Sequence, residues 1–489
     1  MKGIADRFRR QSIAYSLAAV VGPGTGVLLL PIYTRVLSPA DYGLIALLEI
    51  VSLLLGTIFS LGMTAIVPFY YTDRLSDADR RASMGTLVLA VTAINAALSG
   101  LIWLVGPWAL GIALPSLPFQ PYVPLLLLTA FLEPYWGTFS AVMQIQERAY
   151  FYSIFSIARI VVSLTLRIVL VVVVPWGVFG FVLANLLTAG AAALVTSPFL
   201  AREMSLRFRP SALVAAAQLG LPALPNNLLT TGFRGLDRVF LDRFATRDEI
   251  GLYYLALRVA DVLRILAEVC ISAWRPLFFK EAGDAAFASD VAPRMMRVLS
   301  VAFISAFVGL SLLVHELLAV LAPPVYAGAA PFVPALVAAM ALKGIYTFPY
   351  LAIWYRRRTV YLPILTGITL AFSVAANVLL GPHFGAMGVA AVLLMSYGLL
   401  LVSAYFVAKR IYPIPYPWRH VLTAGGIGMA AVMIGSELGS GLVPFLLRLL
   451  LLAGYFAALV PTGCVRLSEL RGALSPMSLR DTREEARQP

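Results

Sequence analysis

Charged residues are scarce in this sequence. Only 12% of its 489 residues are Asp, Glu, Lys or Arg, whereas about a quarter of the residues in a soluble globular chain are charged. Apolar residues make up 60% of the chain, and the mean hydropathy is +0.88. These values exclude a soluble globular protein and predict a multi-pass membrane protein.

Cysteine and recognisable catalytic motifs are equally scarce. The two cysteines, Cys270 and Cys464, fall within or beside apolar runs, so no disulfide framework is predicted. The sequence has no G-x-x-x-x-G-K-[ST] motif, which excludes a P-loop for ATP. The Asp77-Ala78-Asp79 stretch resembles the D-x-D of sugar transferases, but it lies in a short loop, and we interpret it as a solvated turn. We therefore expect no metal, no cofactor and no enzymatic activity.

Long apolar runs follow one another almost without pause. A run of about 20 apolar residues can cross the hydrocarbon core of a bilayer. We count fourteen, with approximate centres at Ala19, Leu55, Ile94, Leu128, Ser163, Leu187, Pro222, Val262, Ser305, Leu342, Thr369, Leu394, Gly428 and Ala453. The first run exceeds the h-region of a cleavable signal peptide and lacks an A-x-A-like site after it, so we interpret it as a span. Residues 466–489 are polar and are predicted to form a cytoplasmic tail.

The net charge of +13 is explained by topology. If the N-terminus is cytoplasmic and the chain alternates sides through fourteen spans, cytoplasmic segments hold 26 of the 37 Lys and Arg residues, external loops hold 5 and spans hold 6. Cytoplasmic loops of membrane proteins carry such an excess. We therefore expect both termini in the cytoplasm, Arg356-Arg357-Arg358 to act as a cytoplasmic anchor, and no nucleic-acid partner.

One short loop motif occurs twice. Residues 35–48 read RVLSPADYGLIALL, and residues 243–256 read RFATRDEIGLYYLA. In the second copy, Thr246 and Glu249 have the spacing of a capping box at a helix start. In the first copy, Ser38 is a candidate N-cap, with Pro39 at the first helical position and Asp41 in the first turn. Each copy therefore predicts the start of a new spanning helix.

The two copies belong to a longer duplication at a constant offset of 208 residues. Further matches without gaps are Pro68 with Pro276, Asp73 with Glu281, Arg148 with Arg356, Gly177 with Gly385, and Gly180 with Gly388. Each copy holds six spans, so both enter the membrane in the same direction and form a parallel repeat. We predict two six-helix lobes, residues 1–206 and 207–412, followed by a helix pair at 413–465 and the tail.

The opening stretch LLLPIYTRVLSPADYGLIAL, its repeat and the six-plus-six-plus-two layout resemble the Wzx-type polysaccharide repeat-unit flippases. This family shares a superfamily with multidrug-and-toxin extruders and the lipid II flippase. The resemblance implies a V-shaped exporter fold in a bacterial cytoplasmic membrane. It also implies an undecaprenyl-pyrophosphate-linked oligosaccharide as cargo, alternating access as mechanism, and a polysaccharide polymerase among the assembly partners.

Charges within the spans are the candidate substrate contacts, because a charge at mid-membrane costs about 2.5–3.5 kcal/mol unless it faces a cavity or a partner. In the eighth span, Arg258, Asp261, Arg264 and Glu268 lie on one helix face at pairing distances. They form either structural ion pairs or a cavity site in which arginines bind pyrophosphate. The other basic candidates are Arg159, Arg167, Arg234 and Lys343, and the other acids, which could couple transport to an ion or pair structurally, are Glu49 and Glu133.

The seventh span, QLGLPALPNNLLTTGFRG, is polar and interrupted, as is GPGTG at 22–26 in the first span. Matched Gly and Pro interruptions are typical of bent helices along a transport path. The predicted bend residues are Gly22, Pro23, Gly24, Pro222, Pro225 and Gly232. Arg448 is interpreted as a structural or snorkelling residue, and Trp103, Trp108 and Trp176 as interfacial belts rather than sugar platforms.

Two other functions fit a membrane protein of this size. A multidrug or cation extruder would share the fold, but it requires an acidic cavity, and the basic eighth span disfavours this. A membrane glycan polymerase or ligase would require a sizeable external catalytic loop, and the external loops here, around residues 106–121 and 235–249, are short.

Overall fold

The computed structural model describes residues 25–71, 75–220, 222–439 and 441–465. All regular secondary structure within these ranges is helical, which confirms the predicted all-α fold. Nine helical stretches of the described chain are long and apolar enough to cross a membrane. The predicted centre at Ala19 lies outside the described residues, and the total of fourteen spans stays a prediction.

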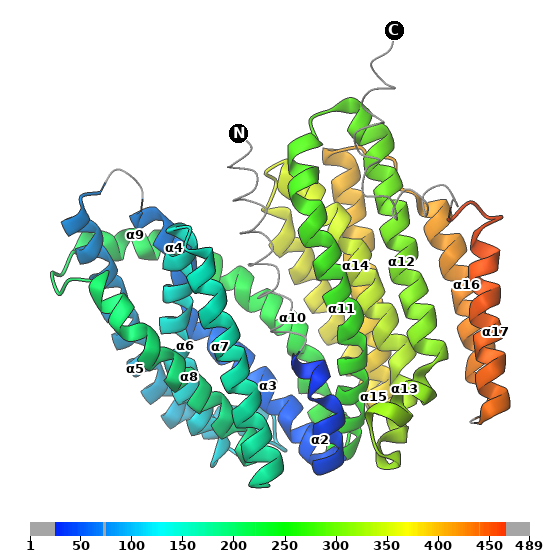
Figure 1. Ribbon diagram of the computed structural model, residues 1–489, viewed down its shortest axis with the longest axis horizontal. Helices are drawn as coiled ribbons and strands as arrows, with labels where there is room; N and C mark the ends of the chain where they lie inside the picture. The colour runs from blue at the N-terminus through cyan, green and yellow to red at the C-terminus, as the bar shows by residue number, and fades with distance from the viewer. Residues whose placement is uncertain (1–24, 72–74, 221, 440, 466–489) are drawn as a thin grey trace.

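The first bundle runs from α2 to α8. Its elements are α2 (Leu30–Val36), α3 (Pro39–Ser60), α4 (Met63–Tyr70), α5 (Asp77–Ala113), α6 (Tyr122–Ile145), α7 (Ala149–Ile168), the short π-helix η1 (Val169–Val173) and α8 (Gly177–Arg202). Helix α9 (Pro210–Gly220) follows in the chain and packs on α4 and α5 of this bundle. Helix α10 (Ala223–Phe244) then crosses to the second bundle (Figure 1).

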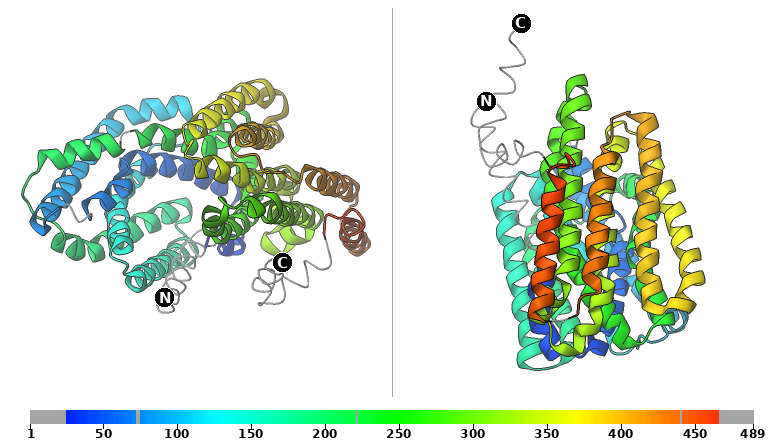
Figure 2. Two further views of the ribbon diagram at one scale, coloured as in Figure 1. Left: turned by 90° about the horizontal axis from the view of Figure 1, so that it is seen from above. Right: turned by 90° about the vertical axis from the view of Figure 1, so that its right-hand side faces the viewer.

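The second bundle is built from α10 to α15. Its further elements are α11 (Arg247–Glu281), the π-helix η2 (Phe287–Val291), α12 (Ala292–Leu312), α13 (Val314–Leu321), the 3₁₀-helix η3 (Pro324–Phe332), α14 (Val333–Tyr355) and α15 (Tyr361–Ile411). The last pair, α16 (Trp418–Ser436) and α17 (Leu442–Leu459), packs on α12 at the outside of this bundle (Figure 2). The lobe boundaries at residues 206 and 412 stay predictions.

The duplicated loop motif forms the same local structure twice. Helix α11 begins with the predicted capping box between Thr246 and Glu249, and α3 begins at the predicted N-cap Ser38, which also forms a capping box with Asp41. In each box the N-cap hydroxyl accepts a hydrogen bond from a backbone N–H of the first turn, and the acid accepts one from the N-cap backbone. Both helix starts are therefore set by local side chains.

A second pair of matched residues shares an unusual backbone conformation. Gly177 and Gly385, which are 208 residues apart, both have φ +54°. This left-handed region is readily accessible only to glycine. Gly177 begins α8, and Gly385 forms a kink that divides α15 into two helical segments. The two bundles therefore turn at equivalent points, as the duplication predicts.

The two bundles meet at one end and spread apart at the other, which gives the molecule a V shape (Figure 1). At the closed end, α3 crosses α11 at Gly43 and Gly251, again 208 residues apart. A Cβ on Gly43 would lie 2.2 Å from the carbonyl oxygen of Arg247, and one on Gly251 would lie 1.9 Å from that of Pro39. The contact is reciprocal, because Pro39 and Arg247 are themselves matched. This is the geometry of a pseudo-twofold axis between the bundles.

Polar contacts reinforce the closed end. The backbone N–H of Ser116, in the loop between α5 and α6, donates to Asp242 of α10 at 3.2 Å, and the Ser116 hydroxyl donates to the same carboxylate. Arg247 donates to the Ser116 carbonyl. The Thr34 hydroxyl donates to the Leu321 carbonyl at 2.9 Å. The first and second bundles are thus joined at this end by hydrogen bonds in which a side chain takes part each time.

Candidate functional site

A cavity of about 1840 Å³ lies between the two bundles. Its walls come from α3, α6, α7 and α8 of the first bundle and from α10, α11, α14 and α15 of the second. Seven basic side chains and four carboxylates line it: Arg159, Arg167, Arg234, Arg238, Arg258, Arg264 and Lys343, with Glu49, Glu133, Asp237 and Asp261. The lining is therefore polar and carries an excess of positive charge.

Arg258 is held by groups from both bundles. Its guanidinium donates to Glu49 of α3, to the Tyr254 hydroxyl, and to Asp261 at 3.1 Å. It also lies over the Tyr254 ring, 4.6 Å from the centroid. With three oxygen acceptors around it, Arg258 connects α3 to α11 and uses three of its five N–H donors for contacts within the protein.

Arg264 also pairs with Asp261. Its Nε donates to Asp261 at 2.6 Å, and its Nη1 donates to Glu268 at 3.0 Å. Asp261 therefore bridges Arg258 and Arg264, and the pairs expected from their spacing of three and four residues are present. Arg258, Asp261 and Arg264 line the cavity, whereas Glu268 pairs with Arg264 from beyond the cavity lining.

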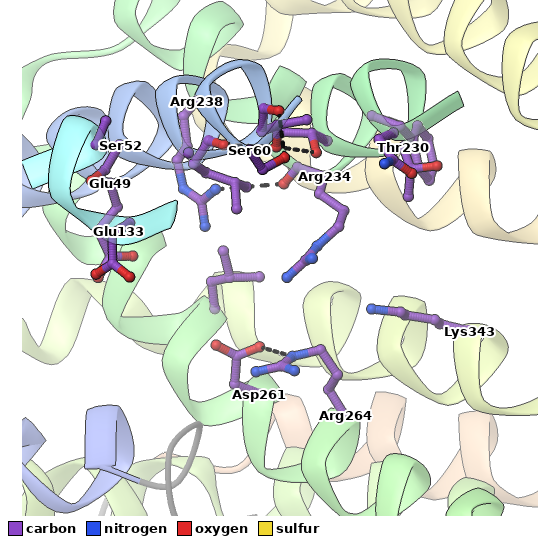
Figure 3. Close-up of a pocket in the computed structure, with 18 of the residues that line it drawn as sticks. Glu49, Ser52, Ser60, Glu133, Thr230, Arg234, Arg238, Asp261, Arg264 and Lys343 are labelled. Atoms are coloured by element: carbon purple, nitrogen blue, oxygen red, sulfur yellow. Dashed lines mark hydrogen bonds and ion pairs between the residues drawn. The ribbon is translucent and has the colours of Figure 1, made fainter. Parts of the chain in front are cut away.

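Three cavity cations of the second bundle have no ion-pair partner among the described residues: Arg234 and Arg238 of α10, and Lys343 of α14. The Lys343 Nζ lies 6.0 Å from the centroid of the Tyr397 ring. Arg234, Arg264 and Lys343 come from three different helices and point into one common space (Figure 3). We define these three side chains as the cation cluster.

The first bundle supplies a second pair of arginines. Arg159 pairs with Glu133 at 2.5 Å and lies 5.0 Å from the centroid of the Trp136 ring. Arg167 donates to the Asn185 side-chain oxygen at 2.8 and 3.2 Å. The two arginines thus line the cavity and are also bonded within their own bundle.

Sequence reasoning missed two charged residues of the cavity. Asp237 and Arg238 follow Arg234 on α10 at three and four residues, which places all three on one helix face. Asp237 accepts a hydrogen bond from the Tyr253 hydroxyl at 2.9 Å, and Arg238 lies over the Tyr254 ring. The spacing from Arg234 was a usable signal for both.

The predicted bend residues fall in different places. Gly22, Pro23 and Gly24 lie outside the described residues. Pro222 is the N-cap of α10, Pro225 lies in its first turn, and α10 continues as a helix through Gly232. The interruption of this region is therefore between α9 and α10, beside Pro222, which lines the cavity.

Arg448, by contrast, has a structural role outside the cavity. Arg448 is 1% exposed and donates to Glu316 at 2.8 Å and to carbonyls of Gly435, Leu438 and Gly439. It therefore holds the end of α16 against α13. No group of three His, Cys, Asp or Glu side chains in the described ranges could hold a metal ion.

A known protein family matches most of this sequence. Residues 32–331 match the model of a family described as polysaccharide biosynthesis protein. The chain belongs to this family. The sequence matches no curated protein.

Solved structures with the same fold are membrane exporters. The lipid II flippase MurJ in an inward closed conformation has a TM-score of 0.72 and 14% identity, and the match covers 92% of this chain and 97% of that one. An inward-facing multidrug resistance MATE family transporter of the MOP superfamily has a TM-score of 0.62, 12% identity and coverage of 79% and 94%. The MATE multidrug transporter DinF-BH has a TM-score of 0.58, 16% identity and coverage of 84% and 96%. At these identities the likeness shows the fold, which is that of a two-lobed membrane exporter.

Proposed function

We propose that this protein is a flippase that moves a saccharide linked to a lipid pyrophosphate from the inner to the outer leaflet of a bacterial cytoplasmic membrane. The product would serve the assembly of a surface polysaccharide such as O-antigen, capsule or exopolysaccharide, with a polymerase acting on it afterwards. The observation that carries this proposal is the positively charged cavity between two bundles that are joined at one end only.

The distribution of basic residues favours loading from the cytoplasmic side. The turns after α6, α8, α11 and α14 lie at the open end and contain or adjoin Arg148, Arg202, Arg207, Arg209, Lys280, Arg356, Arg357 and Arg358. The turns of the closed end contain or adjoin only Arg35, Arg243 and Arg247 in the described chain. By the positive-inside rule the open end faces the cytoplasm. The structure would then be an inward-open state.

The cation cluster suits a pyrophosphate. Arginine offers paired N–H donors that match phosphate oxygens, and lysine offers a compact charge. Arg234 and Lys343 have no ion-pair partner in the described chain, and Arg264 shares one of its two acids, Asp261, with Arg258. An inside-negative potential favours outward movement of an anion by about 2.3 kcal/mol per charge per 100 mV. Transport of this cargo therefore needs no ATP site.

The proposal is tested in a strain that lacks the gene. Carrier-linked oligosaccharides are extracted, identified by mass spectrometry and assigned to a leaflet. We expect complete repeat units on the inner leaflet and loss of surface glycan. Complete units on the outer leaflet would instead indicate a polymerase, and an unchanged lipid pool with altered toxin sensitivity would indicate an extruder.

Complementation with variants then tests the cation cluster. Lys343→Met and Arg264→Gln should lower the surface glycan about tenfold or more at equal expression, because each removes a charge-assisted bond to phosphate. Lys280→Met is the matched control, since Lys280 is exposed at the end of α11 and does not line the cavity. Full glycan levels with Arg264→Gln and Lys343→Met together would refute the assigned role.

A further inference from the structure

Three aromatic side chains form a ladder on the cavity face of α14. Tyr346, Tyr350 and Trp354 are spaced four residues apart, and all three line the cavity. The ring centroids are 6.0 Å apart between Tyr346 and Tyr350 and 6.2 Å apart between Tyr350 and Trp354, and the latter two rings are nearly parallel, with 24° between their planes. We call these three residues the aromatic ladder.

The ladder is separate from the aromatic residues of the molecule's outer surface. Trp103, Trp108 and Trp176 are strongly exposed and do not line the cavity, as expected for interfacial belts. Trp354 is 46% exposed, yet it lines the cavity and makes an edge contact with Phe279, with 6.2 Å between centroids. The ladder is therefore held in place by protein contacts and faces the cavity interior.

The ladder continues directly from the cation cluster toward the open end. Lys343 precedes Tyr346 by three residues on the same helix. At 1.5 Å per residue, Trp354 lies about 16 Å further along α14 than Lys343. A ligand whose anionic group rests on Lys343 would extend along the ladder toward the mouth of the cavity.

The surrounding walls are rich in uncharged hydrogen-bonding groups. The hydroxyl and amide side chains that line the cavity include Ser52, Thr57, Ser60, Thr129, Ser156, Ser163, Asn185, Thr188, Asn226, Asn227, Thr230, Thr231, Thr359 and Thr366. Such groups exchange hydrogen bonds with sugar hydroxyls, while an aromatic face covers the apolar C–H face of a sugar ring. Aromatic rings with convergent polar groups are the usual composition of a small-molecule site.

We infer that the aromatic ladder is a saccharide subsite, which binds the sugar rings of the cargo while the cation cluster binds its phosphate. This inference rests on the proposed function, because it divides one cargo between two parts of the same cavity. An organic cation would also contact aromatic rings, but the excess of basic side chains beside the ladder disfavours it.

The test separates the two parts of the cargo. Two probes are titrated onto the purified full-length protein in lipid nanodiscs by calorimetry. One is the oligosaccharide released by mild acid from the carrier lipids of the deletion strain, which has no phosphate and no lipid. The other is undecaprenyl pyrophosphate without sugar.

The variants are Tyr350→Leu and Trp354→Leu, with Trp108→Leu as the matched control on the exposed face of α5. We expect each ladder variant to weaken binding of the oligosaccharide about tenfold and to leave pyrophosphate binding unchanged. Tyr350→Phe keeps the ring and should retain most of the affinity. The opposite selectivity is expected of Lys343→Met.

Each of the remaining outcomes refutes either the saccharide subsite or the proposed function. If the ladder variants bind the oligosaccharide as tightly as the wild type, the saccharide subsite is refuted while the flippase proposal stands on the pyrophosphate titration. Equal weakening of both probes by the ladder variants would show a structural role and also refute the subsite. If the wild type binds neither probe, the proposed function fails together with the subsite.

Discussion

The reciprocal contact between Gly43 and Gly251 provides a direct test of how the two bundles move. Real Cβ atoms do not approach other atoms closer than 3.0 Å, whereas the added Cβ would lie at 2.2 Å in Gly43→Ala and at 1.9 Å in Gly251→Ala. Helices α3 and α11 must therefore separate by roughly 0.8 Å and 1.1 Å, the differences from 3.0 Å. Overpacking of this kind costs about 1–3 kcal/mol.

This cost applies only to the state in which the closed end is intact. If the bundles part there during transport, each substitution shifts the population toward that second state by about 5- to 150-fold. The two substitutions should be less than additive together, because one separation relieves both clashes. Each substitution should therefore favour the state with a parted closed end, and the effects of the two substitutions should be coupled.

Electron paramagnetic resonance measures the shift as a distance distribution at the open end. Spin labels are placed on cysteines at Leu206 and Lys280, both exposed, after Cys270→Ser and Cys464→Ala. We expect a population with shorter distances to grow in Gly43→Ala and Gly251→Ala, since opening one end of the V draws the other ends together.

Gly309→Ala on α12 is the matched control for this measurement. No atom lies within 4 Å of its added Cβ, so its distance distribution should match that of the wild type. Distributions for Gly43→Ala and Gly251→Ala that coincide with this control would refute the idea that the closed end opens.

Two further predictions concern charged pairs. Arg448→Met should lower the free energy of unfolding by about 3–5 kcal/mol, because it removes the guanidinium that donates to Glu316 and to the carbonyls of Leu438 and Gly439; thermal melts in detergent check this, and an unchanged Tm would contradict it. Glu49→Gln and Arg258→Met, made singly and together, should give a coupling energy of about 0.5–3 kcal/mol in a double-mutant cycle, because the two groups bond directly across the bundles; simple additivity would show that this contact contributes nothing.

Local signals predicted most of what the structure contains at short range. The capping boxes at Ser38 and Thr246 depend on residues three positions apart, so the sequence pattern is sufficient. The pairing of Arg264 with Glu268 follows from the helical repeat in the same way. The match of Gly385 with Gly177 was visible in the sequence as part of the duplication, and the structure gives both glycines φ +54°.

Contacts between bundles could not be predicted from spacing. Arg258 and Glu49 are 209 residues apart, and only the crossing of α3 over α11 brings them together. The aromatic ladder had a readable periodicity of four residues, but periodicity alone does not distinguish a face toward a cavity from one toward lipid. Tertiary packing decides that question, and it assigns Trp354 and Trp108 to different surroundings.

The reciprocal glycine contact also bears on how such a chain could arise. A contact in which Gly43 meets the matched loop and Gly251 meets the first loop is isologous, the kind that two identical subunits form across a twofold axis. An unfused half-length ancestor could therefore have assembled as a homodimer through this same surface. The flanking positions Pro39 and Arg247 differ between the two copies, whereas both copies have glycine where each helix is confined by the backbone of the other.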